Sequence, residues 1–519
     1  MTVGNRGLRW PRTGPETPDW RTLVVKLPEP PLLPASDAEW KGPWSDDHLG
    51  TLDPLGVQFP GVHVHPSFAT VSLPALLNLV SEAHVHAKDR KRRLVSYFSV
   101  ECPPSVPTAA VAAYITSSSA ANVVYLDPLA LEPPGPSTAG IDQTSRDSTM
   151  QRAALLKRVL DRLGPRAERA EAAYQRDLDR LPSRAGPLFE GLLAGAKWRQ
   201  FDRNVIDPAG VAWDGSGVLV VDVEQGWSVN FDGESLHHAL QGPPVITPVM
   251  AGSGAARSWL FHGHGTAVLS VLRAIVPAAT PRVAATWADT PTGPPARNLA
   301  GAIIAATAEA AGLSDSRTVI LIEAQSRLNG TGPFLPAEVD PRVFEAIALA
   351  SDLGIVVVEA AGNGQTNLDS VTVPLLPPGL TGPRAPHPFS TGADSGAILV
   401  GAAVEWQGGW VRAASSNFGR RVICWGPGEN VPAAGDGWLR AQDDWFTTTF
   451  GGTSAASAVV AGAAAALLGQ MTPAASRGER VARLTALRAK LTSAAANTST
   501  LDPASDRIGV MPNLSRIAP

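Results

Sequence analysis

Residues 218–222, Val-Leu-Val-Val-Asp, show which kind of fold the chain adopts. Their four apolar residues form an unbroken run, which is typical of a strand covered on both faces and not of a half-exposed one. Similar apolar runs recur at 319–322, 355–358, 397–400 and 422–423. Strands of this type occur mainly in parallel sheets that carry helices on both faces.

Helical patterns lie between these runs. They cover residues 265–275, 299–311, 341–353 and 454–470. The alternation predicts an α/β fold with a doubly wound, mainly parallel sheet. Ligands of such a sheet bind beyond the carboxyl ends of its strands.

The region before this sheet has a different pattern. Strands are expected at 22–27, 95–102 and 122–126, and helices at 73–86 and 108–117. This order suits a small α+β unit with helices on one face of an antiparallel sheet.

The chain therefore divides into four parts. We expect a flexible lead at 1–20, an α+β domain at 21–135, a linker with a charged helical insertion at 136–197, and the doubly wound domain at 198–519. The insertion has helical spacing at 146–182, which predicts a solvated surface hairpin. An arm that binds a protein partner is the alternative.

Composition excludes several classes of function. The 519 residues include 43 Lys and Arg against 47 Asp and Glu, so neither nucleic acid nor an anionic membrane is an expected partner. The two cysteines, Cys102 and Cys424, are too few for a disulfide framework or a four-cysteine zinc site. No apolar run marks a secretory signal within residues 1–20, and the longest apolar stretch, 458–468, is too short for a membrane span. We therefore expect a cytoplasmic location.

Three polar residues stand at strand ends or helix starts. Asp222 follows the first apolar run, His264 lies at a helix start, and Ser454 begins the last helix. Each alone has an ordinary explanation, because Asp is common in turns and Ser is a favoured helix cap. Together, in the order Asp, His, Ser, they match one of the three chain orders known for serine-hydrolase triads.

Five motifs in register resemble the subtilisin-like serine peptidases, or subtilases. They are Val221–Gly226, His264–Thr266, Ala360–Gly364, Ser416–Gly419 leading into Gly426–Glu429, and Gly452–Ser454. The resemblance covers roughly residues 200–519. It implies a serine endopeptidase that cleaves peptide or protein substrates and needs no cofactor.

The resemblance also implies roles for particular residues. Ser454 would be the nucleophile, His264 its base and Asp222 the carboxylate that orients the imidazole. Asn363 would be the side-chain donor of the oxyanion hole, together with the backbone N–H of Ser454. No metal site is expected, because no Cys or carboxylate lies at ligand spacing near the pair His262 and His264.

The chain departs from the family in two places. Residues 455–458 are Ala-Ala-Ser-Ala where the family usually has Met-Ala-Ser-Pro, and 323–327 are Glu-Ala-Gln-Ser-Arg where it usually has Ser-x-Gly-Gly. Glu323 and Glu359 follow strands that should be neighbours, so one or both could line the S1 pocket and favour a basic substrate residue. A hydrogen-bonded structural pair with one raised pKa is the alternative.

The N-terminal unit resembles the ferredoxin-like propeptide of subtilases, which inhibits through its C-terminal tail. The expectation is an enzyme restrained by its own N-terminal domain. The alternative function is a non-catalytic or permanently inhibited subtilase-fold module that binds a partner. The related carboxyl peptidases, with Glu in place of His, are disfavoured because His264 stands in its full motif.

Overall fold

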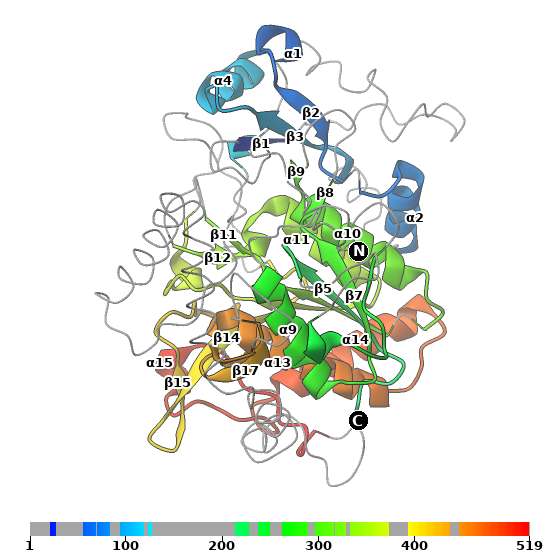
Figure 1. Ribbon diagram of the computed structural model, residues 1–519, viewed down its shortest axis with the longest axis vertical. Helices are drawn as coiled ribbons and strands as arrows, with labels where there is room; N and C mark the ends of the chain where they lie inside the picture. The colour runs from blue at the N-terminus through cyan, green and yellow to red at the C-terminus, as the bar shows by residue number, and fades with distance from the viewer. Residues whose placement is uncertain are drawn as a thin grey trace, which may run out of the picture.

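The computed structural model describes residues 21–26, 55–68, 70–83, 94–118, 123–126, 213–227, 237–249, 262–288, 296–315, 317–327, 333–372, 393–435 and 446–517. Their strands include a central eight-stranded sheet and a four-stranded N-terminal sheet, which lies above the central sheet in the view of Figure 1. The expected lead at 1–20 and the expected insertion at 136–197 fall outside the described residues.

The central sheet is mainly parallel. Its order is β15-β14-β13-β10-β5-β7-β6, with β16 beside β14, and of these pairs only β14 with β15 is antiparallel. The strands are β5 (Leu219–Glu224), β6 (Thr247–Pro248), β7 (Thr280–Ala285), β10 (Thr318–Ile322), β13 (Val356–Ala360), β14 (Ile398–Trp406), β15 (Gly409–Arg412) and β16 (Cys424–Pro427).

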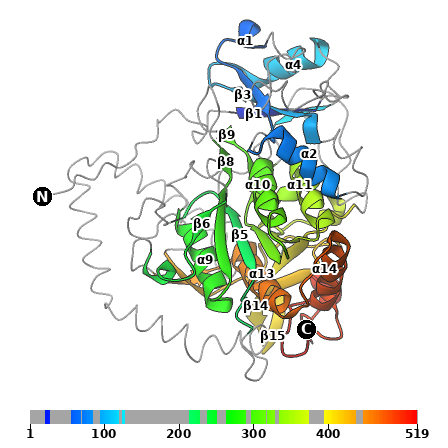
Figure 2. The same cartoon turned by 90° about the vertical axis from the view of Figure 1, so that its right-hand side faces the viewer.

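Helices cover both faces of this sheet (Figure 2). One face packs against α9 (His262–Ile275), α13 (Gly452–Gln470) and α14 (Arg477–Thr492), and the other against α10 (Leu299–Ala311) and α11 (Pro341–Asp352). Alternation along β10 shows the division, since Val319 and Leu321 join the α9 and α13 core while Ile320 and Ile322 join the other. The prediction of a doubly wound, mainly parallel α/β fold is confirmed.

Local sequence explains where several helices begin. Asn298 caps α10 by accepting from the backbone N–H of Gly301, and Asp340 caps α11, whose first residue is Pro341. Helix α14 begins with a capping box between Ser476 and Glu479. These caps accept hydrogen bonds from backbone N–H groups that have no partner within the first helical turn.

Helix α13 runs through the centre of the fold. Among the described residues it alone is long and apolar enough to cross a membrane, and 94% of that apolar stretch is buried within the protein. Its composition therefore fits its position as the core helix.

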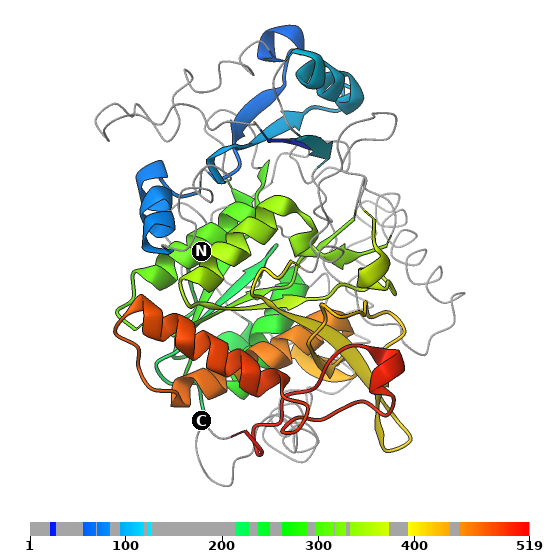
Figure 3. The ribbon, with the colours of Figure 1, turned by 180° about the vertical axis from the view of Figure 1, so that it is seen from behind.

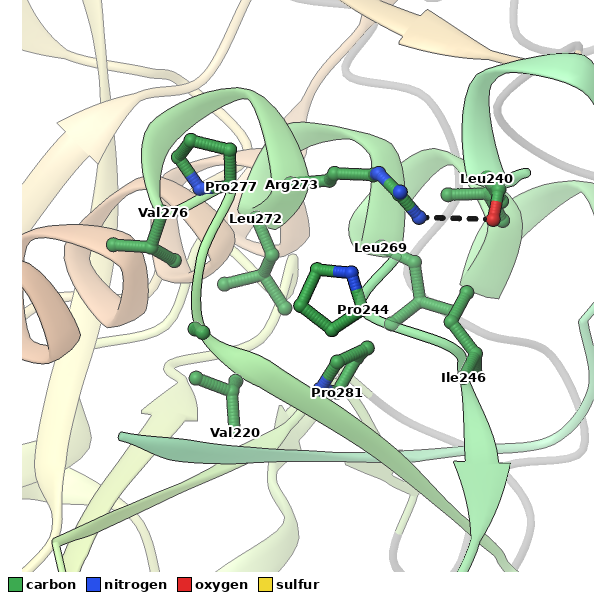
Figure 4. A pocket seen from close by; sticks show the side chains of 11 residues that line it. Val220, Leu240, Pro244, Ile246, Leu269, Leu272, Arg273, Val276, Pro277 and Pro281 are labelled. Carbon is green, nitrogen blue, oxygen red and sulfur yellow. Dashed lines mark hydrogen bonds between the residues drawn. The ribbon is translucent and has the colours of Figure 1, made fainter. Parts of the chain in front are cut away.

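A small apolar cavity of about 30 Å³ lies behind α9 (Figure 4). Leu269 and Leu272 of α9 line it together with Val220 of β5. Arg273 donates hydrogen bonds to the carbonyls of Leu240, Gly242 and Pro243 at 2.9–3.0 Å. The helix that carries His264 is thus tied to the chain that precedes it.

The N-terminal sheet is antiparallel, in the order β2-β3-β1-β4. Its elements are β1 (Arg21–Lys26), α1 (Leu55–Gln58), β2 (His63–Pro66), β3 (Tyr97–Cys102), α4 (Thr108–Ser118) and β4 (Val123–Leu126). Val111 and Ile115 of α4 pack with Leu23 and Phe98 in a core of their own. In contrast, α2 (Leu73–Ala83) packs against α10 and α11 of the larger part (Figure 3).

Short elements complete the described chain. They are η4 (His238–Leu240), β8 (Trp287–Ala288), β9 (Ala296–Arg297), β11 (Gln325–Ser326), β12 (Leu335–Pro336), η6 (Ala337–Val339), η7 (Leu368–Ser370), β17 (Val431–Ala434), β18 (Phe446–Phe450) and α15 (Pro503–Asp506).

Candidate active site

Two carboxylates project from the end of β5 toward the α9 and α13 face. Asp222 and Glu224 are two residues apart on the strand, so both side chains lie on the same face, and both are buried. Glu224 is the last residue of the strand, at the carboxyl edge where ligands of parallel sheets bind. The geometry therefore places Glu224 closest to the expected site.

His264 bonds Glu224. The Nδ1 of His264 lies 2.6 Å from Oε2 of Glu224, and both side chains are almost fully buried. A carboxylate at Nδ1 holds the proton on that nitrogen and leaves Nε2 as the basic nitrogen. The pair has the arrangement of a catalytic base and its orienting acid.

Asp222 has a different partner. Its Oδ2 accepts a hydrogen bond from Nε1 of Trp227 at 2.7 Å. Burial and the negative charge of Glu224 raise the pKa of the Asp222 carboxyl well above its ordinary value of 3.8, although the Trp227 bond acts in the opposite direction. Burial beside Glu224 thus favours the neutral form of Asp222.

The expectation that Asp222 orients His264 is therefore corrected in favour of Glu224. The apolar run at 218–221 suggested a strand that stops before Asp222, but β5 continues to Glu224. Asp222 consequently lies within β5, two residues before its carboxyl end at Glu224.

Tight packing fixes the start of α9. A Cβ added to Gly265 would meet the carbonyl oxygen of Gly226 and lie 2.6 Å from the Trp227 ring. Only glycine fits at this position. The first turn of α9 is therefore pressed onto the segment that follows Glu224.

Ser454 lies in the first turn of α13, next to α9. Its side chain is fully buried, and its hydroxyl faces the Glu323 carboxyl, whose pKa it lowers. Phe450, four residues earlier, meets the His264 ring edge-on with 5.6 Å between the centroids. Helices α9 and α13 also pack directly on each other, so the structure brings the starts of both helices together.

Asn363 is attached to the same turn of α13. Its Oδ1 accepts from the backbone N–H of Thr453 at 3.0 Å and from the Thr453 hydroxyl at 3.1 Å. Its Nδ2 is buried and has no hydrogen-bond partner among the described residues. The amide thus keeps a donor available close to Ser454, as an oxyanion hole requires.

A glycine at 452 permits this approach. Gly452 has φ +73°, and a Cβ there would lie 2.8 Å from Nδ2 of Asn363. Both the left-handed backbone and the close contact exclude a side chain.

Glu323 is a third carboxyl in the same region. It follows β10, the neighbour of β5, and its Oε1 accepts from the Ser457 hydroxyl at 2.8 Å. Burial, followed by the charges of Asp222 and Glu224, raises its pKa well above the ordinary 4.5. Glu323 therefore points at α13, and its burial beside two carboxyl groups favours its neutral form.

Residues 301–509 match the model of the subtilase family of peptidases. The chain carries a subtilase domain. The matched range includes Asn363 and Ser454, whereas Glu224 and His264 precede it.

Solved structures of subtilases are similar to the chain at low identity. Fervidolysin from Fervidobacterium pennivorans, a keratinolytic enzyme, is 14% identical over 95% of this chain and 60% of its own, with a TM-score of 0.47. The epidermin leader peptide processing protease EpiP from Staphylococcus aureus is 11% identical over 96% and 97%, with a TM-score of 0.45. The nisin leader peptidase NisP from Lactococcus lactis is 14% identical over 63% and 92%, with a TM-score of 0.37. None of the curated proteins matches the chain.

Glu359 lies on the other face of the subtilase sheet. Strand register pairs Ile322, and not Glu323, with Glu359, so the two glutamates face opposite sides. Oε1 of Glu359 accepts from the backbone N–H of Glu338 at 2.8 Å, and burial and the charge of Glu338 raise its pKa well above 4.5. The two glutamates therefore neither line one S1 wall together nor pair with each other, and the expectation that one of them lines the S1 pocket stays a prediction.

Within the described ranges of the subtilase domain and the N-terminal sheet, no three His, Cys, Asp or Glu side chains gather as metal ligands do. His262 begins α9 beside His264 in sequence.

Sequence reasoning missed Glu224, Trp227 and Ser457. A signal for Glu224 was present, because a carboxylate that follows Asp222 by two residues shares its face and lies nearer the sheet edge. Neither Trp227 nor Ser457 has such a signal, since their roles depend on contacts between different elements.

Proposed function

We propose that the chain is a serine endopeptidase that hydrolyses peptide bonds through an acyl-enzyme on Ser454. The observation that carries this proposal is the 2.6 Å bond between Nδ1 of His264 and Glu224. A buried imidazole held in this way is prepared to accept a proton at Nε2 and to remain stable as imidazolium.

Each group has a role in the proposed reaction. His264 takes the proton of Ser454 as Oγ attacks the scissile carbonyl, and Glu224 stabilises the imidazolium that forms. Nδ2 of Asn363 and the backbone N–H of Ser454 bind the oxyanion, and the N-terminal end of α13 adds a favourable dipole.

The tetrahedral intermediate formed by this attack then breaks down to the acyl-enzyme. His264 returns the proton to the leaving amine, and the acyl group stays on Ser454. Water, deprotonated by His264, attacks the ester and releases the second product. Asp222, which bonds Trp227 and not His264, takes no part in these proton transfers.

Restraint by the N-terminal part belongs to the same proposal. Three polar contacts support it: Thr70 donates to the carbonyl of Gly301 at 2.7 Å, Arg342 donates to Ser99 at 3.3 Å, and Arg480 pairs with Glu82 at 2.7 Å. Substrates are peptides or proteins. A partner at residues 146–182 and a cytoplasmic location remain predictions.

A fluorophosphonate probe tests the proposal without knowledge of the substrate. We expect the parent chain to be labelled on Ser454, Ser454→Ala to be unlabelled, and Ser505→Ala, an exposed serine of α15, to label like the parent. Intact mass and peptide mapping give the readout. Labelling of Ser454→Ala, or none of the parent even after cleavage between 128 and 200, would contradict the proposal and favour a non-catalytic module.

A further inference from the structure

We propose that Glu323 is a positioning residue: through its hydrogen bond with Ser457 it holds the first turn of α13, and with it the Ser454 hydroxyl, in place. This inference rests on the proposed function of Ser454. It gives Glu323 a role in positioning the nucleophile and not in selecting the substrate.

Ser457 lies one helical turn after the nucleophile. Its Oγ is 2.8 Å from Oε1 of Glu323, 2.7 Å from the carbonyl oxygen of Thr453 and 3.1 Å from that of Ser454. A serine hydroxyl has one proton to donate and can accept another. The single proton of Ser457 is therefore shared between Oε1 of Glu323 and the carbonyl oxygens of Thr453 and Ser454.

Two sets of hydrogen bonds therefore hold the turn that contains Ser454. Asn363 binds the N–H and the hydroxyl of Thr453, and the hydroxyl of Thr453 also accepts from the backbone N–H of Gly362 at 3.2 Å. Glu323 and Ser457 bind the same turn on its carbonyl side. The nucleophile lies between these two attachments, each of which belongs to the end of a different strand.

The surroundings of Glu323 favour its neutral form. The charged or titratable groups that face it are Asp222 and Glu224 from β5, and Glu224 in turn bonds His264 of α9. Helix α13 contributes only the hydroxyls of Ser454 and Ser457. Its side chain is fully buried, and none of the described groups that shift its pKa is a cation.

The neutral form of Glu323 would suit a positioning role at this place. An ionised Glu323 would attract the Ser454 proton and so compete with His264 for it. An uncharged carboxyl can hold Ser457 without that competition. Glutamine has the same shape, is always neutral, and can donate or accept toward Ser457, so Glu323→Gln is the conservative variant.

The test measures the rate at which a fluorophosphonate labels Ser454 in the full chain, separated into a limiting rate and a half-saturating probe concentration. We expect Glu323→Ala and Ser457→Ala to lower the limiting rate by about 10-fold to 100-fold with little change in half-saturation. Glu323→Gln should stay within about threefold of the parent. The double variant Glu323→Ala, Ser457→Ala should lose no more than either single variant, because both remove the same contact.

Amide hydrogen exchange over residues 450–458 gives a second readout that needs no catalysis. Exchange should be faster in Glu323→Ala and Ser457→Ala and unchanged in Glu323→Gln. If the parent is not labelled at all, the proposed function falls while exchange still decides the role of Glu323. Parent-like labelling and exchange in Glu323→Ala would overturn the inference, and so would a Glu323→Gln variant as impaired as Glu323→Ala.

Discussion

Glu224 and Asp222 differ in what a loss of charge should do. Glu224 bonds the imidazole at 2.6 Å, whereas Asp222 is a buried acid with a raised pKa and bonds an indole. We expect Glu224→Gln to lower kcat by about 10⁴, since an amide donor at Nδ1 favours the wrong tautomer. Asp222→Asn changes a side chain that bonds Trp227 and not His264, so it should cost less than about tenfold. Rates of peptide hydrolysis or of fluorophosphonate labelling measure both, and the opposite ranking would restore Asp222 as the orienting acid.

The buried acids also make stability depend on pH. Asp222 and Glu323 have raised pKa values in the folded state, so the folded chain keeps protons that the unfolded chain releases above about pH 4. Their contribution is fully present below the unfolded pKa values and is lost as pH rises toward the folded ones. We expect the free energy of unfolding of Glu323→Gln, relative to the parent, to increase from pH 4 to pH 8. Denaturant titrations at several pH values measure this difference, and a constant difference would mean that Glu323 is ionised when folded.

Residue identities could be predicted from sequence where a single short motif carries them. His264, Ser454 and Asn363 each lie in such a motif, and in the structure His264 bonds Glu224 while Asn363 bonds Thr453, the residue before Ser454. The choice between Asp222 and Glu224 depended on where β5 ends, which an apolar pattern does not give when the last strand residues are charged. The placement of Glu359 depended on strand register, which reverses the face of a side chain with a shift of one residue.

At the scale of elements, periodicity predicted the long buried strands and helices. The helices at 299–311 and 341–353 match α10 and α11 to within a residue, whereas the strand expected at 422–423 is found as β16, Cys424–Pro427. Helix α14 was not predicted, because its many arginines conceal the apolar stripe of Leu484, Leu487 and Leu491. Its capping box, Ser476 with Glu479, was a usable signal.

The start of α13 is the element most sensitive to an added methyl group. Gly452→Ala would force a side chain at φ +73° and place its Cβ 2.8 Å from Nδ2 of Asn363. We expect this to displace the oxyanion donor and lower kcat by about 10²–10³, as loss of such a donor does. Gly478→Ala is the matched control, since its Cβ would meet nothing closer than 4.0 Å in α14. Turnover at saturating substrate distinguishes the two, and equal activity would show that Asn363 tolerates the shift.

At the scale of the whole molecule, the N-terminal sheet is attached to the subtilase domain through α2 and a few polar contacts. Leu73, Leu76 and Val80 of α2 join the core that α10 and α11 form, and Glu82 pairs with Arg480 of α14. Apolar burial holds the two parts together, because a pair whose Glu82 side chain is 42% exposed contributes only about 0–1 kcal/mol. Cleavage between the parts should therefore not separate them at once.

This attachment predicts a delayed release of activity. In a chain with an engineered cleavage site between 136 and 197, we expect cleavage to leave the two parts associated on gel filtration and hydrolysis of a protein substrate to remain slow. Leu76→Asp should then speed dissociation and the rise in hydrolysis, because it buries a charge in the contact between α2, α10 and α11. Glu82→Gln, which removes only the exposed ion pair, should change both rates less than about threefold. If the uncleaved parent hydrolyses protein as fast as the dissociated subtilase domain, restraint by the N-terminal part is refuted. If hydrolysis stays slow after the two parts have dissociated, the inhibition does not depend on this contact.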